Sequence, residues 1–572
     1  MTLWSAIASK LKEIWQKMFS NSAIENALDI KIAPIISNEM EQAIKLWDDM
    51  YKGKPDWIHE PDSTNPIRVV SLGIPAMIAS EKARTALIEF NSEITVPVEE
   101  KEVDNPDYEQ PEPDEFGNLI PTAEPKTIIK ETPKSSDERA KYLNEQYTKL
   151  KKKLRTQLEY GIAKGGLVIK PYLIINNPKT DKKKTESDAD IEPTTEIEFD
   201  FIQADNFYPL AFDASGRITE AAFVQTKVDK TTIYRRLEYH KWENNKVTVI
   251  NKAFKTNNLQ GEMMGPLMDL GKECPLSEIP EWKDYQEKTV IKNVEQPLFS
   301  YFKMPEANTI DTNSPLGVSG YSRATSLIKD ADLQYSRLLW EYEAGEMAID
   351  IDRDALKTVS GPDGVAHEEL THMQERLFRK VDLSATGETY NPFAPALRDT
   401  AYIQGLNTIL MRIEDVCGVS RGTISDAASE ARTATELKIL KQRSYQTNAD
   451  IQQSLEDSLR EVIYIMNVYC DLYQVTKAGE YDVSFEWDDS IITDVDAELS
   501  KRITLMQQGL VSKIENRMWY FGESERQARE ALTSIREDEI ESAEDNITNF
   551  FGGNNNKNNN KFQKKKEDGF ND

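Results

Sequence analysis

Cysteine and histidine are scarce in this chain of 572 residues. There are three cysteines and four histidines: Cys274, Cys417, Cys470, His59, His240, His367 and His372. Thiols so few and so far apart, with no CxxC pair, argue against a disulfide framework or a structural zinc site. The closest histidine pair, at 367 and 372, has a spacing of five, which puts two rings about 140° apart on a helix. We therefore expect no metal ion and no cofactor.

Motifs that carry chemistry are also missing. The chain has no GxxxxGK[ST] loop to hold a nucleotide phosphate and no GxSxG turn to present a serine nucleophile. Acidic residues at 350, 352 and 354, and again at 488, 489, 494 and 496, could hold Mg²⁺ for a nuclease. No basic cleft accompanies them, and acids at strand ends and helix starts commonly act as caps. We expect no enzyme, and a metal-dependent nuclease using Asp350 and Asp352 stays as an alternative.

Positive charge is in deficit. Lys and Arg total 70 against 98 Asp and Glu, for a net charge of −28. A surface this acidic repels phosphate, which argues against nucleic acid wrapping the whole protein but permits DNA to pass without being held. The basic run 149–155 is either a solvated helix face or a local phosphate contact. No window reaches the apolar run that a membrane span needs, so we expect no membrane partner.

The first 165 residues carry mainly helical patterns. Apolar positions between 3 and 18 suggest an amphipathic helix, either for docking or packing or for a membrane surface. Apolar residues from Ile35 to Met50 recur at steps of three and four and predict a helix, a second is predicted from Pro75 to Glu93, and a basic one from 137 to 160. Between them, residues 97–136 are rich in Pro and acids and predict a disordered insertion.

Strand patterns follow. They are predicted within 167–175, 195–202 and 221–228, and a hairpin joins 234–242 to 246–254 through a bend at Glu243-Asn244-Asn245. Phe207-Tyr208-Pro209 is predicted to interrupt a strand, and 213–216 to form a turn. With the helices on either side, the sequence predicts an α+β fold that is mainly α.

The second half returns to helices. They are predicted at 319–346, 366–378 and 397–416, with a short strand at 347–351 and extended chain at 379–395. Small and polar residues from 417 to 431 predict a flexible loop. The helix predicted over 433–475 would span about 60–65 Å, too long for an ordinary globule. A strand at 481–487 follows, then capping boxes at Thr493 with Asp496, Ser512 with Glu515, and Ser524 with Gln527.

The order of these elements resembles the portal proteins of tailed bacteriophages, of the siphovirus type, over about residues 35–545. The stretches that carry the resemblance are 35–51, 204–209, 216–223, 236–253, 320–332 and 417–437. The strongest runs from Cys417-Gly418-Val419-Ser420 to Ala431-Arg432-Thr433-Ala434-Thr435-Glu436-Leu437 and leads into the long helix. No single stretch is diagnostic, but together their order is specific.

The resemblance implies a portal fold with wing, stem, clip and crown, a long radial helix and a ring oligomer. Its parts would be a wing at 1–315 with the disordered acidic insertion 97–136, stem helices at 316–347 and 397–416, a clip at 348–396, a tunnel loop at 417–432, a long wing helix and strand at 433–493, a crown at 494–548 and a disordered tail at 549–572. A clip of this size has too little core to fold alone, so neighbouring subunits would complete it.

The resemblance also implies a function: a ring at one capsid vertex through which DNA is packaged and ejected. The tunnel loop would line the DNA channel with Ser420, Arg421, Thr423, Ser425 and Arg432, and the clip would dock partners through Glu368, Glu369 and Arg376. Arg421 either faces the channel or joins an intersubunit salt bridge.

The implied partners are further copies of the chain in a dodecameric ring, the terminase large subunit, a head-completion or adaptor protein, the major capsid and scaffolding proteins, and double-stranded DNA translocated non-specifically. The implied location is the portal vertex of the virion, and the host cytoplasm during assembly. Another head or tail structural protein of a virion is the alternative.

Overall fold

The structure is a computed structural model in which two compact units follow one another along the chain, residues 1–488 and 489–572. It describes residues 27, 37–61, 68–88, 90–104, 127–134, 137–176, 194–257, 270–352, 357–360, 366–369, 377–381, 390–426, 434–487, 495–522, 527–529 and 531–535. The amphipathic stretch at 3–18 and the tail at 549–572 lie outside these residues. The fold is a mixture of helices and strands.

Four helices build the centre of the first unit: α2 (Asn38–Tyr51), α3 (Ile74–Ala86), α4 (Glu138–Lys164) and α7 (Ala434–Leu472). Helix α2 begins where the Ser37 hydroxyl accepts a hydrogen bond from the Met40 N–H. Its apolar stripe is buried as the spacing predicts, at Met40, Ile44, Trp47 and Met50.

Helix α3 ends seven residues earlier than the predicted Glu93. Phe90–Thr95 instead forms strand β1, which pairs antiparallel with β18 (Asp482–Trp487). Its inward side chains, Ser92 and Ile94, alternate with exposed ones. The helix prediction was wrong here because the partner strand lies nearly 400 residues further along the chain, beyond the reach of a local pattern.

The acidic insertion is not a loop throughout. Its two ends form β2 (Val98–Asp104) and β3 (Thr127–Pro133), paired antiparallel with Val103 opposite Ile128. The prediction of disorder across 97–136 was therefore wrong at both ends, since a hairpin can be held by backbone pairing without a large core. Residues 105–126 lie outside the description.

A six-stranded antiparallel sheet occupies the middle of the chain. Its path is β10 (Lys272–Cys274), β9 (Lys246–Thr256), β8 (Thr232–Glu243), β7 (Ile218–Asp229) and β6 (Phe207–Phe212), and β11 (Lys288–Lys292) also pairs with β9. The predicted hairpin is confirmed, with Asn244 and Asn245 at φ 52° and 54° in its turn.

The predicted break at Phe207-Tyr208-Pro209 was wrong, because these residues open β6. Pro209 is tolerated there because β6 is the edge strand of the sheet and one side of it needs no ladder hydrogen bond. The expected turn follows it, with Gly216 at φ 84°.

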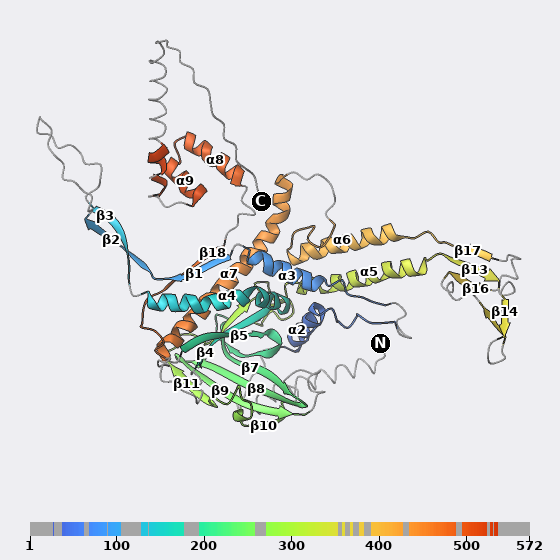
Figure 1. The fold of residues 1–572 in the computed structure, drawn as a ribbon, viewed down its shortest axis with the longest axis horizontal. Coiled ribbons are helices and arrows are strands. Elements are labelled where there is room, and N and C mark those ends of the chain that lie inside the picture. Colours follow the sequence, from blue (N-terminus) through green and yellow to red (C-terminus); the bar gives the residue numbers. More distant parts are fainter. Residues whose placement is uncertain are drawn as a thin grey trace, which may run out of the picture. The chain divides into compact units, whose positions relative to one another are not determined.

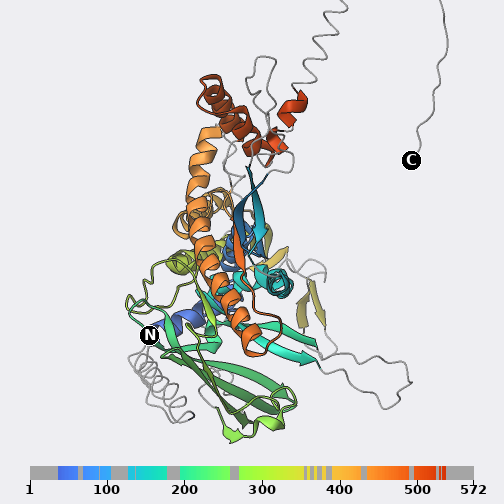
Figure 2. The same cartoon turned by 90° about the vertical axis from the view of Figure 1, so that its left-hand side faces the viewer.

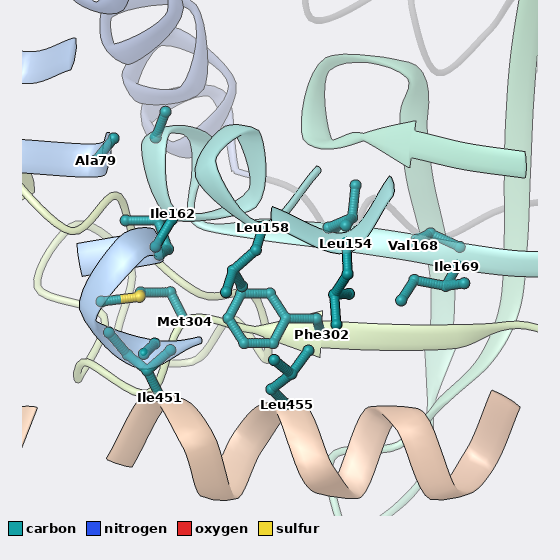
Figure 3. Packing of buried hydrophobic residues seen from close by; sticks show 14 of the residues in the cluster. Ala79, Leu154, Leu158, Ile162, Val168, Ile169, Phe302, Met304, Ile451 and Leu455 are labelled. Carbon is teal, nitrogen blue, oxygen red and sulfur yellow. The ribbon is translucent and has the colours of Figure 1, made fainter. Parts of the chain in front are cut away.

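The main core lies between α4 and α7. Strands β12 (Ser300–Lys303), β4 (Gly166–Asn176) and β5 (Thr194–Gln203) form a three-stranded sheet against these helices. Figure 3 shows Phe302 between Leu158 of α4 and Leu455 of α7, and all three are buried. Each such side chain stabilises the fold by about 1.5–3 kcal/mol. The sheet of β6–β10 lies beside β4 and β5 in both ribbon views (Figures 1 and 2).

Helix α7 has 39 residues and spans about 58 Å. Its predicted stripe is buried at Ile451, Leu455, Leu459, Val462 and Met466. Tyr473, the last member of that stripe, is instead 52 % exposed because the helix ends at Leu472.

Helices α5 (Thr325–Ala344) and α6 (Asp399–Cys417) form a hairpin, and Figure 1 shows them running alongside each other. Between them the chain makes five short strands: β13 (Ala348–Asp352), β14 (Lys357–Ser360), β15 (Ala366–Glu369), β16 (Phe378–Val381) and β17 (Tyr390–Phe393). The order β16-β13-β17 makes one sheet and β14-β15 another.

The helix predicted at 366–378 was wrong in its described parts. Residues 366–369 pair as a strand with 357–360, and Phe378 opens β16. Cross-strand pairing here outweighs the local preference for helix. His367 therefore lies on a strand opposite Val359, and His372 lies outside the description.

The second unit contains α8 (Val495–Gln507) and α9 (Lys513–Phe521). The capping box predicted at Ser512 and Glu515 is confirmed: the Ser512 hydroxyl accepts from the Glu515 N–H at 3.1 Å and the carboxylate accepts from the Ser512 N–H at 2.7 Å. Gly509 follows α8 at φ 73°, and Thr493 and Ser524 of the other two boxes are not among the described residues.

Candidate functional site

The loop that follows α6 contains the residues predicted to line a channel. Helix α6 is closed by Gly418 at φ 70°, and the N–H groups of Gly418 and Val419 both donate to the Glu414 carbonyl. A Cβ added at 418 would lie 2.4 Å from the Thr447 hydroxyl of α7. Glycine is thus required twice at this position, once for the backbone angle and once for the close approach of α7.

The Glu414 side chain organises the rest of the described loop. It is fully buried, and its carboxylate accepts from the N–H groups of Ile424 at 2.7 Å, Ser425 at 2.9 Å and Gly422 at 3.3 Å. The Ser425 hydroxyl adds a fourth bond at 2.7 Å. Several convergent N–H donors are what a buried carboxylate needs in place of water. The turn 422–425 is therefore wrapped around the last turn of α6.

The outer side of the same loop is held by Asp415. The Arg421 guanidinium makes two bonds to that carboxylate, Nε–Oδ1 at 3.0 Å and Nη2–Oδ2 at 2.7 Å, and Arg421 stays 44 % exposed. The Thr423 hydroxyl donates to the Ser420 carbonyl at 2.5 Å. The Asn407 side chain accepts from the Asp426 N–H at 2.8 Å.

The structure thus brings Ser420, Arg421, Thr423 and Ser425 together in one turn, with Ser425 buried rather than presented outward. Arg432 lies outside the described residues. Sequence reasoning missed Glu414 and Asp415, which position the others. One signal was available: two acids occupy the last turn of a predicted helix, where the helix dipole disfavours them.

The helical hairpin is fastened at the end away from this loop. The Arg398 side chain donates to Glu341 through Nε–Oε1 at 3.1 Å and Nη2–Oε2 at 2.7 Å, and its backbone N–H adds a bond at 3.2 Å. These bonds lower the pKa of Glu341. A Cβ at Gly345 would lie 2.2 Å from the Leu397 side chain, so the two helix ends meet closely.

The α5 helix is also fixed to the chain that precedes it. Asp332 is only 1 % exposed, and its carboxylate accepts from the Trp57 indole N–H at 3.0 Å and the Leu72 N–H at 2.8 Å. The Ser336 hydroxyl, one turn on, accepts from the Val70 N–H. Burial raises the pKa of Asp332.

Large apolar side chains stand exposed along the hairpin and at its far end. They are Leu339, Trp340, Tyr342, Met347, Tyr390, Leu397 and Ile403, and their exposed fractions run from 37 % to 66 %. A surface of this kind on a long hairpin is typical of a protein–protein contact.

The residues predicted to dock partners fall on the short strands. Glu368 and Glu369 lie on β15, opposite Thr358 and Lys357. Arg376 lies outside the described residues.

The acids considered for a nuclease are placed in part. The Asp350 carboxylate accepts from the Arg379 Nε at 2.8 Å on the adjacent strand β16, so Asp350 is one half of an ion pair. Asp352 is the last residue of β13, the strand that also contains Asp350. Throughout the described part of the chain, no three His, Cys, Asp or Glu side chains lie close enough together to hold a metal ion.

Two lysines of the basic run at 149–155 are paired with acids of β5. Lys149 lies 2.7 Å from Glu196 of β5, and Lys153 lies 3.5 Å from Glu198. These contacts favour a surface held by ion pairs over a phosphate contact. No helix among the residues described here has the length and hydropathy to cross a membrane.

Comparison with known protein families identifies the family of this chain. The family described as phage portal protein, SPP1 Gp6-like, matches residues 35–545. No curated protein matches the chain. The matched range holds the six-stranded sheet, the α5–α6 hairpin, the loop after α6, and α7. The resemblance noted in the sequence is confirmed, and the chain belongs to the phage portal protein family.

Proposed function

We propose that twelve copies of this chain form a ring at one vertex of the capsid, and that DNA is packaged and later ejected through its centre. The observation that carries the proposal is the apolar surface of the α5–α6 hairpin, which the single chain leaves exposed. A head-to-tail contact repeated around an axis would cover such a surface in every copy. Family membership supplies the portal role.

In this proposal α5 and α6 are the stem. The Glu341–Arg398 bonds join the two helices at the end next to the short strands, and Asp332 joins α5 to the backbone of Leu72. The hairpin would therefore act as one rigid element. The wing would be 1–315 with the long helix and strand of 433–493, and the crown would be 494–548. The tunnel loop would be 417–432, of which the described part is wrapped around Glu414.

The strands between the two stem helices would be the clip, at 348–396. Its described strands are four or five residues long. Such a small unit buries too little apolar surface to be stable alone. Neighbouring clips in the ring would complete it, and its outer surface would receive the terminase large subunit and later the adaptor protein. Capsid and scaffolding proteins would surround the ring, assembled in the host cytoplasm.

Charge suits a conduit. The chain carries a net charge of −28, so the bulk of its surface repels a phosphate backbone. Arg421 is the cation of the described loop, and Asp415 already neutralises it at 2.7 Å. A few screened phosphate contacts permit DNA to slide, whereas many would hold it in place.

The test is a charge placed on the hairpin surface. Trp340→Glu puts a carboxylate where an apolar contact is proposed, and we expect the variant to remain folded but lose the ring, measured by light scattering after size-exclusion chromatography and by circular dichroism. Met77→Glu is the matched control: Met77 on α3 is 47 % exposed, Trp340 48 %. Met77→Glu should keep the ring. Rings of normal size in Trp340→Glu would contradict the proposal.

A further inference from the structure

The predicted tunnel loop contains a part that is firmly attached. Between Gly418 and Asp426, the backbone N–H groups of six residues donate to acceptors on α6: 418 and 419 to the Glu414 carbonyl, 422, 424 and 425 to its carboxylate, and 426 to Asn407. A glycine-containing loop of small residues is flexible by composition. Here one helix restricts that freedom, because it accepts from six of the nine backbone N–H groups between 418 and 426.

Glu414 is the centre of this attachment. Both carboxylate oxygens are used, Oε1 by Ile424 and Ser425 and Oε2 by Gly422 and the Ser425 hydroxyl. All four partners are donors, so the site is built for a group that only accepts. A glutamine of the same shape would turn an NH₂ group toward donors and lose about half of these bonds.

The same junction reaches α7. Gly418 abuts Thr447 of that helix so closely that a Cβ has no room. Ile413 and Cys417 of the last α6 turn are buried in the main core. The end of α6 and the loop that follows it are therefore packed against the main core and α7.

We propose that Glu414 is a positioning residue for the DNA path: it fixes residues 418–426 to the last turn of α6, so that the start of the tunnel loop follows the stem helix instead of moving by itself. The expected effect on DNA packaging rests on the proposed portal function, whereas the attachment of the loop to Glu414 does not. Arg421 is bonded to the neighbouring Asp415, so its position along the axis of the proposed channel would be set by α6.

The experiment compares Glu414→Gln with Asp415→Asn in the full chain. In hydrogen–deuterium exchange of the assembled protein, Glu414→Gln should speed exchange of the Ile424 and Ser425 amides at least tenfold. Asp415→Asn removes the partly buried carboxylate that holds Arg421 and also lies 3.9 Å from Arg412, but it leaves Glu414 in place. It should leave these amides within about twofold of the wild type. Ser425→Ala, which removes one donor and leaves α6 intact, is a second test and should raise exchange at Ile424.

DNA packaging supplies the other readout. Glu414→Gln should form rings in normal number yet fill capsids with less DNA, since the loop no longer follows the stem. Unchanged amide exchange in both Glu414→Gln and Ser425→Ala would overturn the attachment. Faster exchange with normal packaging would overturn the positioning role. If the wild-type chain formed no rings, the proposed function would fail while the exchange result still decided the attachment.

Discussion

Buried charged side chains of β8 and β4 are bonded to one another, and we expect them to make the stability of the fold sensitive to acid. On β8, the Glu238 carboxylate lies 2.7 Å from the Lys170 ammonium of β4, 3.0 Å from the Arg236 guanidinium and 2.6 Å from the His240 Nε2. Burial by itself raises the pKa of Glu238, but the two cations and the His240 bond outweigh it and hold the pKa well below its usual value. Burial lowers the pKa of His240 despite its acidic partner.

The sign of the pH effect follows for each group. Glu238 stabilises the fold above the unfolded pKa of 4.5, and this stabilisation disappears only as pH falls toward its much lower folded pKa. His240 takes up a proton in the unfolded chain below its ordinary pKa of 6.5 but resists it when folded. Stability is therefore lost as pH falls below about 6.5, by at most about 1.4 kcal/mol per pH unit.

We expect the thermal midpoint of the wild type to fall between pH 7 and pH 5.5, and His240→Gln to fall less over the same range. The measurement is a thermal melt followed by circular dichroism at each pH. His59→Gln, at a histidine outside the Glu238 cluster, is the control variant. Equal slopes in His240→Gln and the wild type would show that His240 titrates freely in the folded chain.

At the scale of single residues, the sequence predicts helix caps better than contacts between a buried side chain and a loop backbone. The Ser512–Glu515 box was visible because both partners lie three residues apart with fixed chemistry. Glu414 was not, because most of its partners are backbone N–H groups, which every residue except proline carries. Four of the five candidate channel residues lie in one described turn, but the sequence did not reveal that one of them, Ser425, is buried beneath the others.

At the scale of elements, long amphipathic helices were predictable and short pairings were not. The stripe of α7 and the hairpin of β8 and β9 repeat over ten or more residues, so their periods are clear. The strands β1, β2 and β15 are seven residues or shorter. Their structure is decided by partners that a local pattern does not show, and all three were assigned to helix or loop.

The meeting of α6 and α7 can be tested by two glycines with equal backbone angles. Gly418 and Gly73 both have φ 70°, but a Cβ would meet Thr447 at 418 and nothing within 4 Å at 73. Alanine at either position costs about 1 kcal/mol for the left-handed backbone. Gly418→Ala should cost a further 1–3 kcal/mol, roughly, for the forced contact.

Unfolding in denaturant gives the free energy of unfolding of each variant. Gly73→Ala serves as the control, since it carries the backbone cost alone. Equal losses in the two variants would mean that α7 does not press on the loop as closely as the structure shows.

At the scale of the whole molecule, the chain combines a strong negative charge with an exposed apolar surface. Its net charge is strongly negative, yet the long α5–α6 hairpin exposes tryptophan, tyrosine and leucine side chains. The proposed ring would account for both, since the apolar surface would lie between subunits and the acids would remain on the outside and along the path of DNA. The order of the elements was enough to identify the family from sequence, although several individual elements were assigned wrongly.

The most direct measurement is an image of the purified full-length chain by electron microscopy, with its mass determined in solution over a range of concentrations. We expect rings with a central hole and a mass near twelve copies. A stable, fully folded single chain at every concentration would contradict it.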